Sequence, residues 1–98
     1  AEDGRVTNMF NLSMVNKTFE DKSFRLELAD SENTKNATLT MVQKDEILVS
    51  NNEEKKVFMI SKEQKDIHEN EMPMEVNLFV DGELVKTSKF TFLAPVRE

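Results

Sequence analysis

The sequence contains no cysteine and no tryptophan among its 98 residues. Without cysteine, the chain can form no disulfide, no thiolate nucleophile and no cysteine-ligated zinc or iron–sulfur site. It also lacks the Cys…Trp…Cys pattern that marks antibody-type domains. The fold must therefore do without disulfides, and any thiol or cluster chemistry must lie outside this chain.

Basic residues are fewer than acidic ones: the sequence has 13 Lys and Arg but 19 Asp and Glu, which gives a net charge of −6. This balance argues against nucleic acid and against an anionic membrane surface as partners, because both need clustered cations. No run of 18 apolar residues occurs, so no segment is expected to span a bilayer. The length suits one domain over residues 1–98, and the first residue, Ala1, suggests a piece of a larger protein.

Apolar residues recur with a period of two, which is typical of strands covered on one side. In the first segment, Phe10, Leu12 and Met14 share one side of the chain with Val6 and Asn8, and the other side includes Thr7, Asn11 and Ser13. The expected strands span residues 6–14, 24–28, 37–41, 47–49, 57–60, 74–80 and 84–92, separated by polar loops at 16–21, 30–36 and 51–56. Seven such strands predict an all-β, immunoglobulin-like antiparallel two-sheet sandwich without a disulfide.

Asp81-Gly82 is the strongest hairpin signal, because both residues tolerate a positive φ. A two-residue turn there puts Phe90 and Phe92 on the opposite side from Val80, so we expect a longer loop or a β-bulge that restores the alternation. The charged segment 61–72 is expected to be an exposed connection. The predicted core comprises Phe10, Leu12, Phe24, Leu26, Leu39, Val76, Leu78 and Phe90.

The chain offers few candidates for chemistry. The carboxylates are interleaved with lysines, which is typical of solvated surfaces, and we expect no catalytic residue. The single histidine, His68, precedes Met72 and Met74; imidazole and thioether are ligands that suit Cu(I), whereas both methionines equally suit a strand that packs in the core. Asn8 and Asn16 are expected to hydrogen-bond the backbone, with Asn16 capping a turn.

The opening Asp3-Gly4-Arg5-Val6-Thr7-Asn8, followed by an aromatic residue, alternating aliphatic residues and Asn16-Lys17, resembles the start of the C-terminal domain of FixG-type membrane iron–sulfur proteins. The segment Ser23-Phe24-Arg25-Leu26-Glu27-Leu28 is similar to that domain's second strand. Beyond Asp30 the similarity is one of pattern and length.

The resemblance implies a bacterial inner-membrane protein that takes part in redox and copper handling during assembly of a terminal haem–copper oxidase. The domain would be periplasmic and non-catalytic and would hold no cofactor itself, while iron–sulfur clusters would belong to other parts of the protein. Its partner would be an oxidase-assembly or copper-delivery component, or the membrane part of the same chain. Two alternatives are a surface adhesion or tandem-repeat immunoglobulin-like domain and, less favoured, a small periplasmic copper carrier that uses His68, Met72 and Met74.

Overall fold

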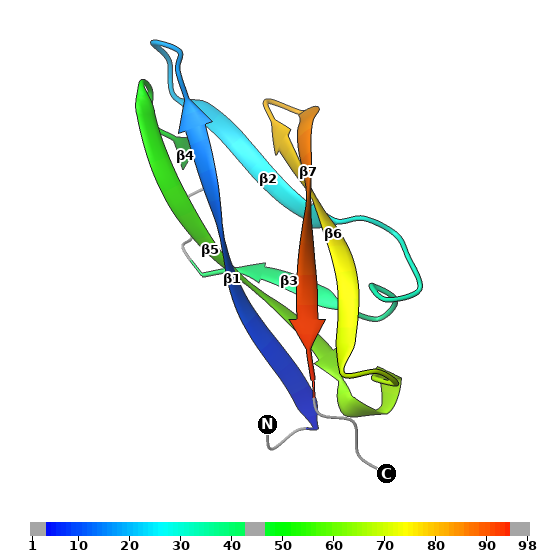
Figure 1. The fold of residues 1–98 in the computed structure, drawn as a ribbon. Coiled ribbons are helices and arrows are strands. Elements are labelled where there is room, and N and C mark those ends of the chain that lie inside the picture. Colours follow the sequence, from blue (N-terminus) through cyan, green and yellow to red (C-terminus); the bar gives the residue numbers. More distant parts are fainter. Residues whose placement is uncertain (1–3, 43–46, 95–98) are drawn as a thin grey trace.

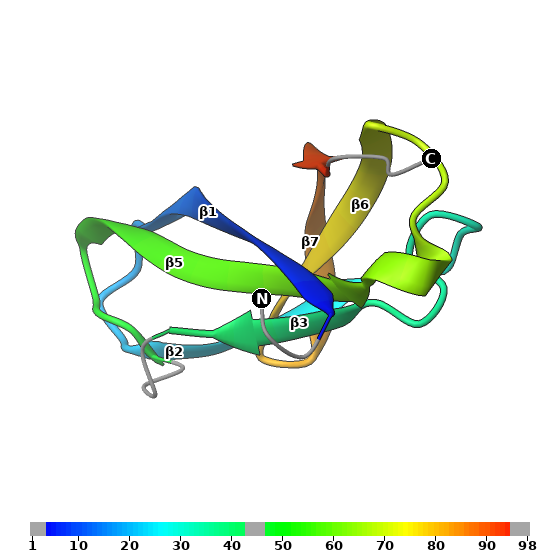
Figure 2. The ribbon, with the colours of Figure 1, turned by 90° about the horizontal axis from the view of Figure 1, so that it is seen from below.

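Seven strands and one short 3-10 turn make up the fold of the computed structural model, which describes residues 4–42 and 47–94. The elements are β1 (Arg5–Asn16), β2 (Lys22–Leu28), β3 (Thr38–Met41), β4 (Ile47–Leu48), β5 (Asn52–Glu63), η1 (Gln64–Asp66), β6 (Glu71–Val80) and β7 (Glu83–Leu93). They form two antiparallel sheets, ordered β1-β5-β3 and β4-β2-β6-β7, that pack face to face (Figures 1 and 2). The predicted two-sheet sandwich is confirmed. No helix in the described ranges is long and apolar enough to cross a membrane.

The core follows from the alternation of side chains along the strands. On β1, residues Leu12, Met14 and Asn16 point inward and are buried, while their neighbours are exposed. Five of the predicted core residues are buried, and the other three, Phe10, Leu39 and Phe90, are partly buried and pack against them.

Aromatic rings join the two sheets near the middle of the sandwich. Phe10 on β1 and Phe58 on β5 both contact Phe90 on β7, each with 5.2 Å between ring centroids. Phe58 meets Phe90 edge to face at 86°, one of the arrangements that the ring quadrupoles favour. This cluster fixes how the two sheets stack.

The hairpin between β6 and β7 has the expected two-residue turn, since Asp81 and Gly82 have φ values of 50° and 85°. Of the two expected solutions the structure has the bulge and not a longer loop: Leu78 pairs with Lys86 but Phe79 pairs with Leu84, which leaves Val85 as the extra residue. Phe90 and Phe92 consequently face the core opposite Met74 and Met72.

Two expectations about the middle of the chain are wrong. Residues 51–56 were predicted as a loop, yet β5 begins at Asn52 and pairs with the whole length of β1. The segment 61–72 is not wholly exposed either, because Lys62 ends the inward row of β5 and Ile67 is buried. Charged residues misled the prediction, since a strand paired to a neighbour tolerates them when their aliphatic stems pack and their ends find partners.

Candidate functional site

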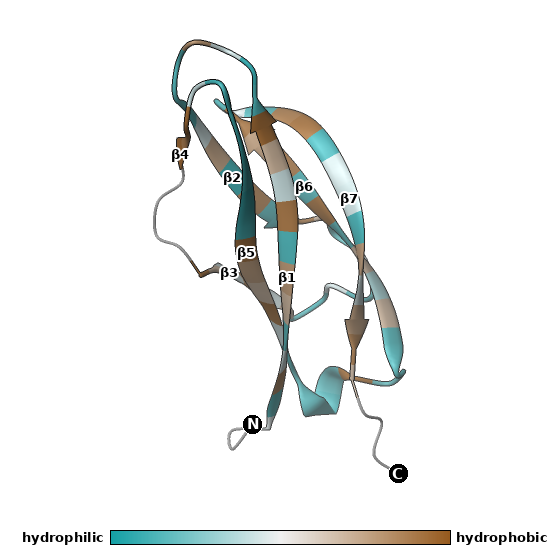
Figure 3. Ribbon diagram, turned by 60° about the vertical axis from the view of Figure 1, so that its left-hand side comes forward, coloured by the Kyte–Doolittle hydropathy of each residue, from teal (hydrophilic) through white to brown (hydrophobic). Residues whose placement is uncertain are grey.

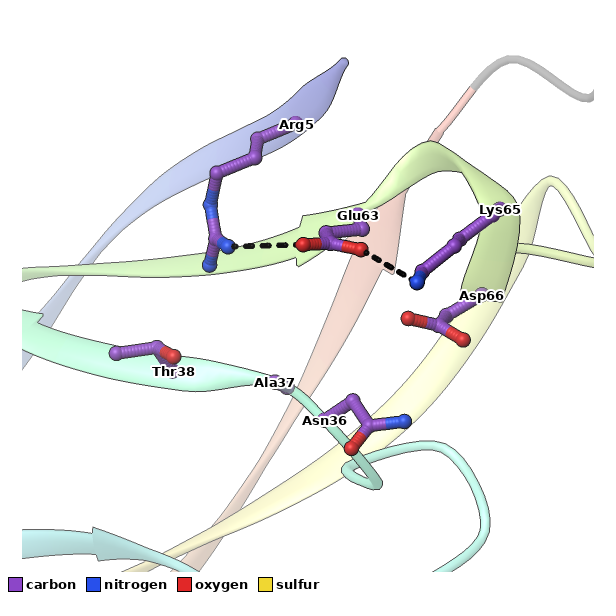
Figure 4. A pocket seen from close by; sticks show the side chains of 7 residues that line it. All are labelled: Arg5, Asn36, Ala37, Thr38, Glu63, Lys65 and Asp66. Carbon is purple, nitrogen blue, oxygen red and sulfur yellow. Dashed lines mark ion pairs between the residues drawn. The ribbon is translucent and has the colours of Figure 1, made fainter. Parts of the chain in front are cut away.

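An open hollow lies at the end of the sandwich where β1 begins and β5 gives way to η1. It has a volume of about 410 Å³ and is lined by Arg5, Asn36, Ala37, Thr38, Glu63, Lys65 and Asp66 (Figure 4). These residues come from β1, from the β2–β3 loop with the start of β3, and from the β5–η1 segment. Their convergence depends on the sheet pairing, because Arg5 on β1 lies opposite Glu63 on β5.

Charges in this hollow are balanced. The Glu63 carboxylate lies 3.9 Å from the Arg5 guanidinium and 3.3 Å from the Lys65 ammonium (Figure 4). Asp66 supplies a second carboxylate to the lining. Two cations and two carboxylates at an exposed surface make weak, solvent-screened pairs, so the hollow suits polar contacts.

A second hollow, of about 250 Å³, shares Asn36 and Asp66 with the first and also contacts Lys62 and His68. Lys62 is 2 % exposed, and its ammonium donates a hydrogen bond of 2.8 Å to the Asn33 carbonyl oxygen. The Asn33 amide in turn donates to the Pro73 carbonyl oxygen at 2.8 Å. Lys62 therefore holds the β2–β3 loop against the sandwich, which gives a buried cation a structural role.

The three copper candidates lie in different surroundings. His68 is exposed beside the second hollow, whereas Met72 and Met74 are buried on the inward side of β6. The methionines pack in the core, the role that their strand positions also allowed. Within residues 4–42 and 47–94, no three His, Asp or Glu side chains gather closely enough to hold a metal ion.

The opposite end of the sandwich carries a braced group of turns (Figure 1). Asn16, buried at the end of β1, donates from its amide to the carbonyl oxygens of Glu20 and Leu48, both at 2.9 Å. Its side-chain oxygen accepts from the backbone N–H and the hydroxyl of Thr18. Asn16 thus caps the β1–β2 turn, as expected, and also ties β1 to β4 of the other sheet.

Neighbouring turns reinforce this end. The Asn51 backbone N–H donates to the Thr18 carbonyl oxygen, and the Ser50 N–H donates to the Asp21 carboxylate. The ordered β1–β2 turn nevertheless leaves the Phe19 side chain 96 % exposed. We call the segments 17–21, 49–51 and 81–82 the distal tip.

Asp81 joins the hairpin to the rest of the distal tip. Its carboxylate accepts from the backbone N–H and hydroxyl of Ser23 and lies 3.4 Å from the Lys22 ammonium. These interactions lower the pKa of Asp81, chiefly through the backbone N–H of Ser23. Asp81 therefore stays ionised and keeps a negative charge at the distal tip.

Sequence reasoning did not identify the residues that line the hollows, because they come from three separate segments whose pairing the sequence does not show. Phe19 was also missed, although an aromatic residue inside a polar loop was a visible signal.

The sequence profile of a domain family described as the IG-like fold at the C-terminus of FixG, a candidate oxidoreductase, matches residues 1–95. The chain belongs to this family. No curated protein matches the sequence. The FixG C-terminal family was already indicated by the opening residues, which include Gly4, Asn8 and Asn16.

The structure explains what those residues do in this FixG C-terminal domain. Gly4 has a φ of +75°, a conformation that side chains rarely adopt. The Asn8 amide donates to the Leu93 carbonyl oxygen at 2.8 Å, and its oxygen accepts from the Leu93 N–H at 3.0 Å. Asn8 and Asn16 therefore fasten both ends of β1 to the opposite sheet, Asn8 to β7 and Asn16 to β4.

Proposed function

We propose that this domain is a non-catalytic, extracytoplasmic interaction module of a FixG-type membrane protein engaged in redox and copper handling for assembly of a terminal haem–copper oxidase. Membership of the FixG C-terminal family supports the parentage. In this proposal the domain lies in the periplasm of a bacterium as one part of a larger inner-membrane protein. Iron–sulfur clusters would belong to other parts of that protein, since this chain has no cysteine to ligate them.

One observation carries the interaction role, namely an aromatic side chain displayed on an ordered support. The hydrogen bonds of Asn16 and Thr18 hold the β1–β2 turn in place, and Phe19 projects from it almost fully exposed. Aromatic anchors dominate many protein interfaces, and an anchor held in a fixed conformation loses less entropy on binding. The distal tip is therefore suited to insert Phe19 into an apolar pocket.

The position of the distal tip fits such a role. β1 starts and β7 ends at the same end of the sandwich, where Asn8 bonds to Leu93, and the distal tip lies at the other end (Figure 1). If a membrane helix precedes β1, the distal tip points away from the bilayer. Acidic Glu20, Asp21 and Asp81 share the distal tip with Phe19 and outnumber its one cation, Lys17. Lys22 beside the distal tip pairs with Glu20 and Asp81, so the remaining charge is weakly negative and fits a partner whose apolar pocket has a mildly basic rim.

Site-specific photocrosslinking tests this proposal. A photoreactive residue in place of Phe19, within the full-length parent protein in its native membrane, should crosslink to an oxidase-assembly or copper-delivery protein. The same residue in place of Lys65, beside the hollow at the other end, is the matched control and should give no such product. Crosslinks that are equal at both positions, or absent at position 19 while the parent protein is stable, would contradict the proposed docking role.

A further inference from the structure

The outer face of the β1-β5-β3 sheet carries a continuous block of uncharged side chains. Register and alternation place outward, on adjacent strands, the residues Thr7, Met9, Asn11 and Ser13 of β1, Val57, Met59 and Ser61 of β5, and Thr38 and Thr40 of β3. We call these nine residues the neutral face. A third of the chain is charged, so a block of this size without a charge is unusual for its surface.

The outer face of the other sheet shows the contrast. There the outward positions include Arg25 and Glu27 on β2, Glu71 and Glu75 on β6, and Lys89 on β7. Arg25 pairs with Glu27 and also lies over the ring of Phe79. The exposed apolar residues of that sheet, Leu84, Val85 and Leu93, lie among these charges, whereas no charge interrupts the neutral face.

The centre of the neutral face is apolar. Met9 on β1 lies directly opposite Met59 on β5 and is 67 % exposed, and Thr40 on β3 flanks Met59 on the other side. β5 changes from hydrophilic near its start to hydrophobic along the part that underlies this centre (Figure 3). Interface cores are depleted in charge and enriched in methionine, which adapts its shape to an opposing surface.

We propose that the neutral face is a self-association surface on which a second copy of this chain docks with two-fold symmetry. Each copy carries a net charge of −6, so two copies repel each other at most orientations and meet most favourably through a surface without charge. This inference is independent of the proposed function, because it uses the side chains of one sheet face and the net charge, and neither Phe19 nor the distal tip.

Lys55 and Glu63 lie four residues before and after Met59 on β5 and carry opposite charges. They favour a two-fold axis that lies in the plane of contact, passes over Met59 and runs perpendicular to the strands. Such an axis places residues equally far before and after Met59 opposite one another, as an isologous contact requires. Glu63 then lies opposite Lys55 of the second copy, and Lys55 lies opposite Glu63. Because Glu63 already contacts Arg5 and Lys65 of its own chain, Lys55 of the second copy would share this carboxylate, and the two ion pairs would add modestly to the contact.

The size of the surface predicts weak association. At a strand spacing of about 4.8 Å and about 3.3 Å per residue, β1 and β5 over the span 55–63, together with the short β3, cover roughly 350 Å² on each copy. Stable interfaces bury about 800 Å² on each partner. We therefore expect a dissociation constant on the order of 10⁻⁴ M.

Sedimentation equilibrium of the 98-residue chain, from about 10⁻⁶ to 10⁻³ M, tests the proposal. The weight-average mass should rise from the 11.3 kDa of one chain towards twice that value. Met59→Asp should weaken association at least tenfold. Met9→Asp, at a more exposed position, should do the same and covers the case in which the first variant fails to fold. Leu84→Asp, an exposed apolar residue on the other sheet, is the matched control and should change nothing.

A charge exchange tests the symmetry. Lys55→Glu and Glu63→Lys should each weaken association several-fold, because each single variant places two like charges opposite one another. The double variant should recover association, since positions 55 and 63 would again carry opposite charges across the contact. A chain that stays monomeric at about 10⁻³ M would overturn the proposal. Association that survives both aspartate variants would also overturn it, as would a double variant no better than the single ones.

Discussion

Replacing Asn16 with alanine should destabilise the domain more than any other single polar substitution on β1. The change removes four hydrogen bonds, two donated to the carbonyl oxygens of Glu20 and Leu48 and two accepted from Thr18. A typical net contribution is about 0.5–1.5 kcal/mol per bond, and a buried carbonyl left without its donor adds a penalty. Because the groups of Thr18 and Glu20 lie near the surface and can rehydrate, we expect a loss of about 2–4 kcal/mol in the free energy of unfolding.

Urea denaturation at about 25 °C measures this loss, provided that the slope of the unfolding free energy against urea concentration is the same in both proteins. A domain of this length has a total stability of roughly 5–15 kcal/mol, so the expected loss is a large fraction. Asn11→Ala is the matched control, since Asn11 lies on the same strand but points outward. It should stay within about 0.5 kcal/mol of the parent. A loss below about 1 kcal/mol for Asn16→Ala would refute the reasoning.

Asn16→Asp separates hydrogen bonding from packing. One oxygen of the new carboxyl would keep the two donors of Thr18, while the other would face the carbonyl oxygens of Glu20 and Leu48. Because the Leu48 contact is buried, we expect the repulsion to outweigh the donors, so that the folded state favours the neutral form and the pKa of the new carboxyl rises above its unfolded value. The stability from the protonated form is present at low pH and is lost as the pH rises through the raised pKa. At neutral pH the aspartate variant should therefore be less stable than Asn16→Ala, and the difference should shrink on acidification.

Three further predictions concern the core, the hairpin and metal binding. Leu26→Ala should cost roughly 2–5 kcal/mol in thermal or urea unfolding, and a negligible change would contradict its place in the core. When followed by NMR, Asp81 should titrate with a pKa below that of an ordinary aspartate. The interactions of its carboxylate therefore stabilise the domain above the ordinary pKa, and this stabilisation is lost as the pH falls through the lowered pKa. Lys22→Ala should move that pKa upward. Calorimetric titration with Cu(I) under reducing conditions, and with Zn(II), should show no tight site; stoichiometric sub-micromolar binding that a Met72→Ala/Met74→Ala variant abolishes would instead favour a copper carrier.

The alternation of side chains made most of the strands predictable, because one side of each strand must face the core. The bulge near Val85 could also be predicted, since Phe90 and Phe92 would otherwise point outward. The start of β5 could not be, because Glu54 and Lys56 resemble a solvated loop until their neighbours are known. In the structure Lys56 packs inward, with its ammonium 3.6 Å from Glu54 and 5.5 Å from the centre of the Phe24 ring.

The candidate sites were harder to predict than the strands. The hollow beside Arg5 and the neutral face both depend on which strands are neighbours, and that information is spread over distant parts of the chain. The outward polar residues of β1 could be recognised in the sequence. That they lie beside Val57 and Met59 follows only from the register of β1 against β5. Phe19 is the exception, since its local surroundings alone indicate exposure.

The bond between Asn8 and Leu93 joins residues 85 positions apart and has a consequence for biogenesis. Nearly all of the domain must leave the ribosome before β1 can be fastened to β7. Until then β1 can pair with β5, but it has no β7 beside it, and Phe10 lacks the ring of Phe90. Folds with such distant contacts form slowly and leave strand edges exposed in the meantime. A chain that ends shortly before Leu93 should therefore stay bound to chaperones. A chain that continues for a few residues beyond β7 should fold and dissociate from them.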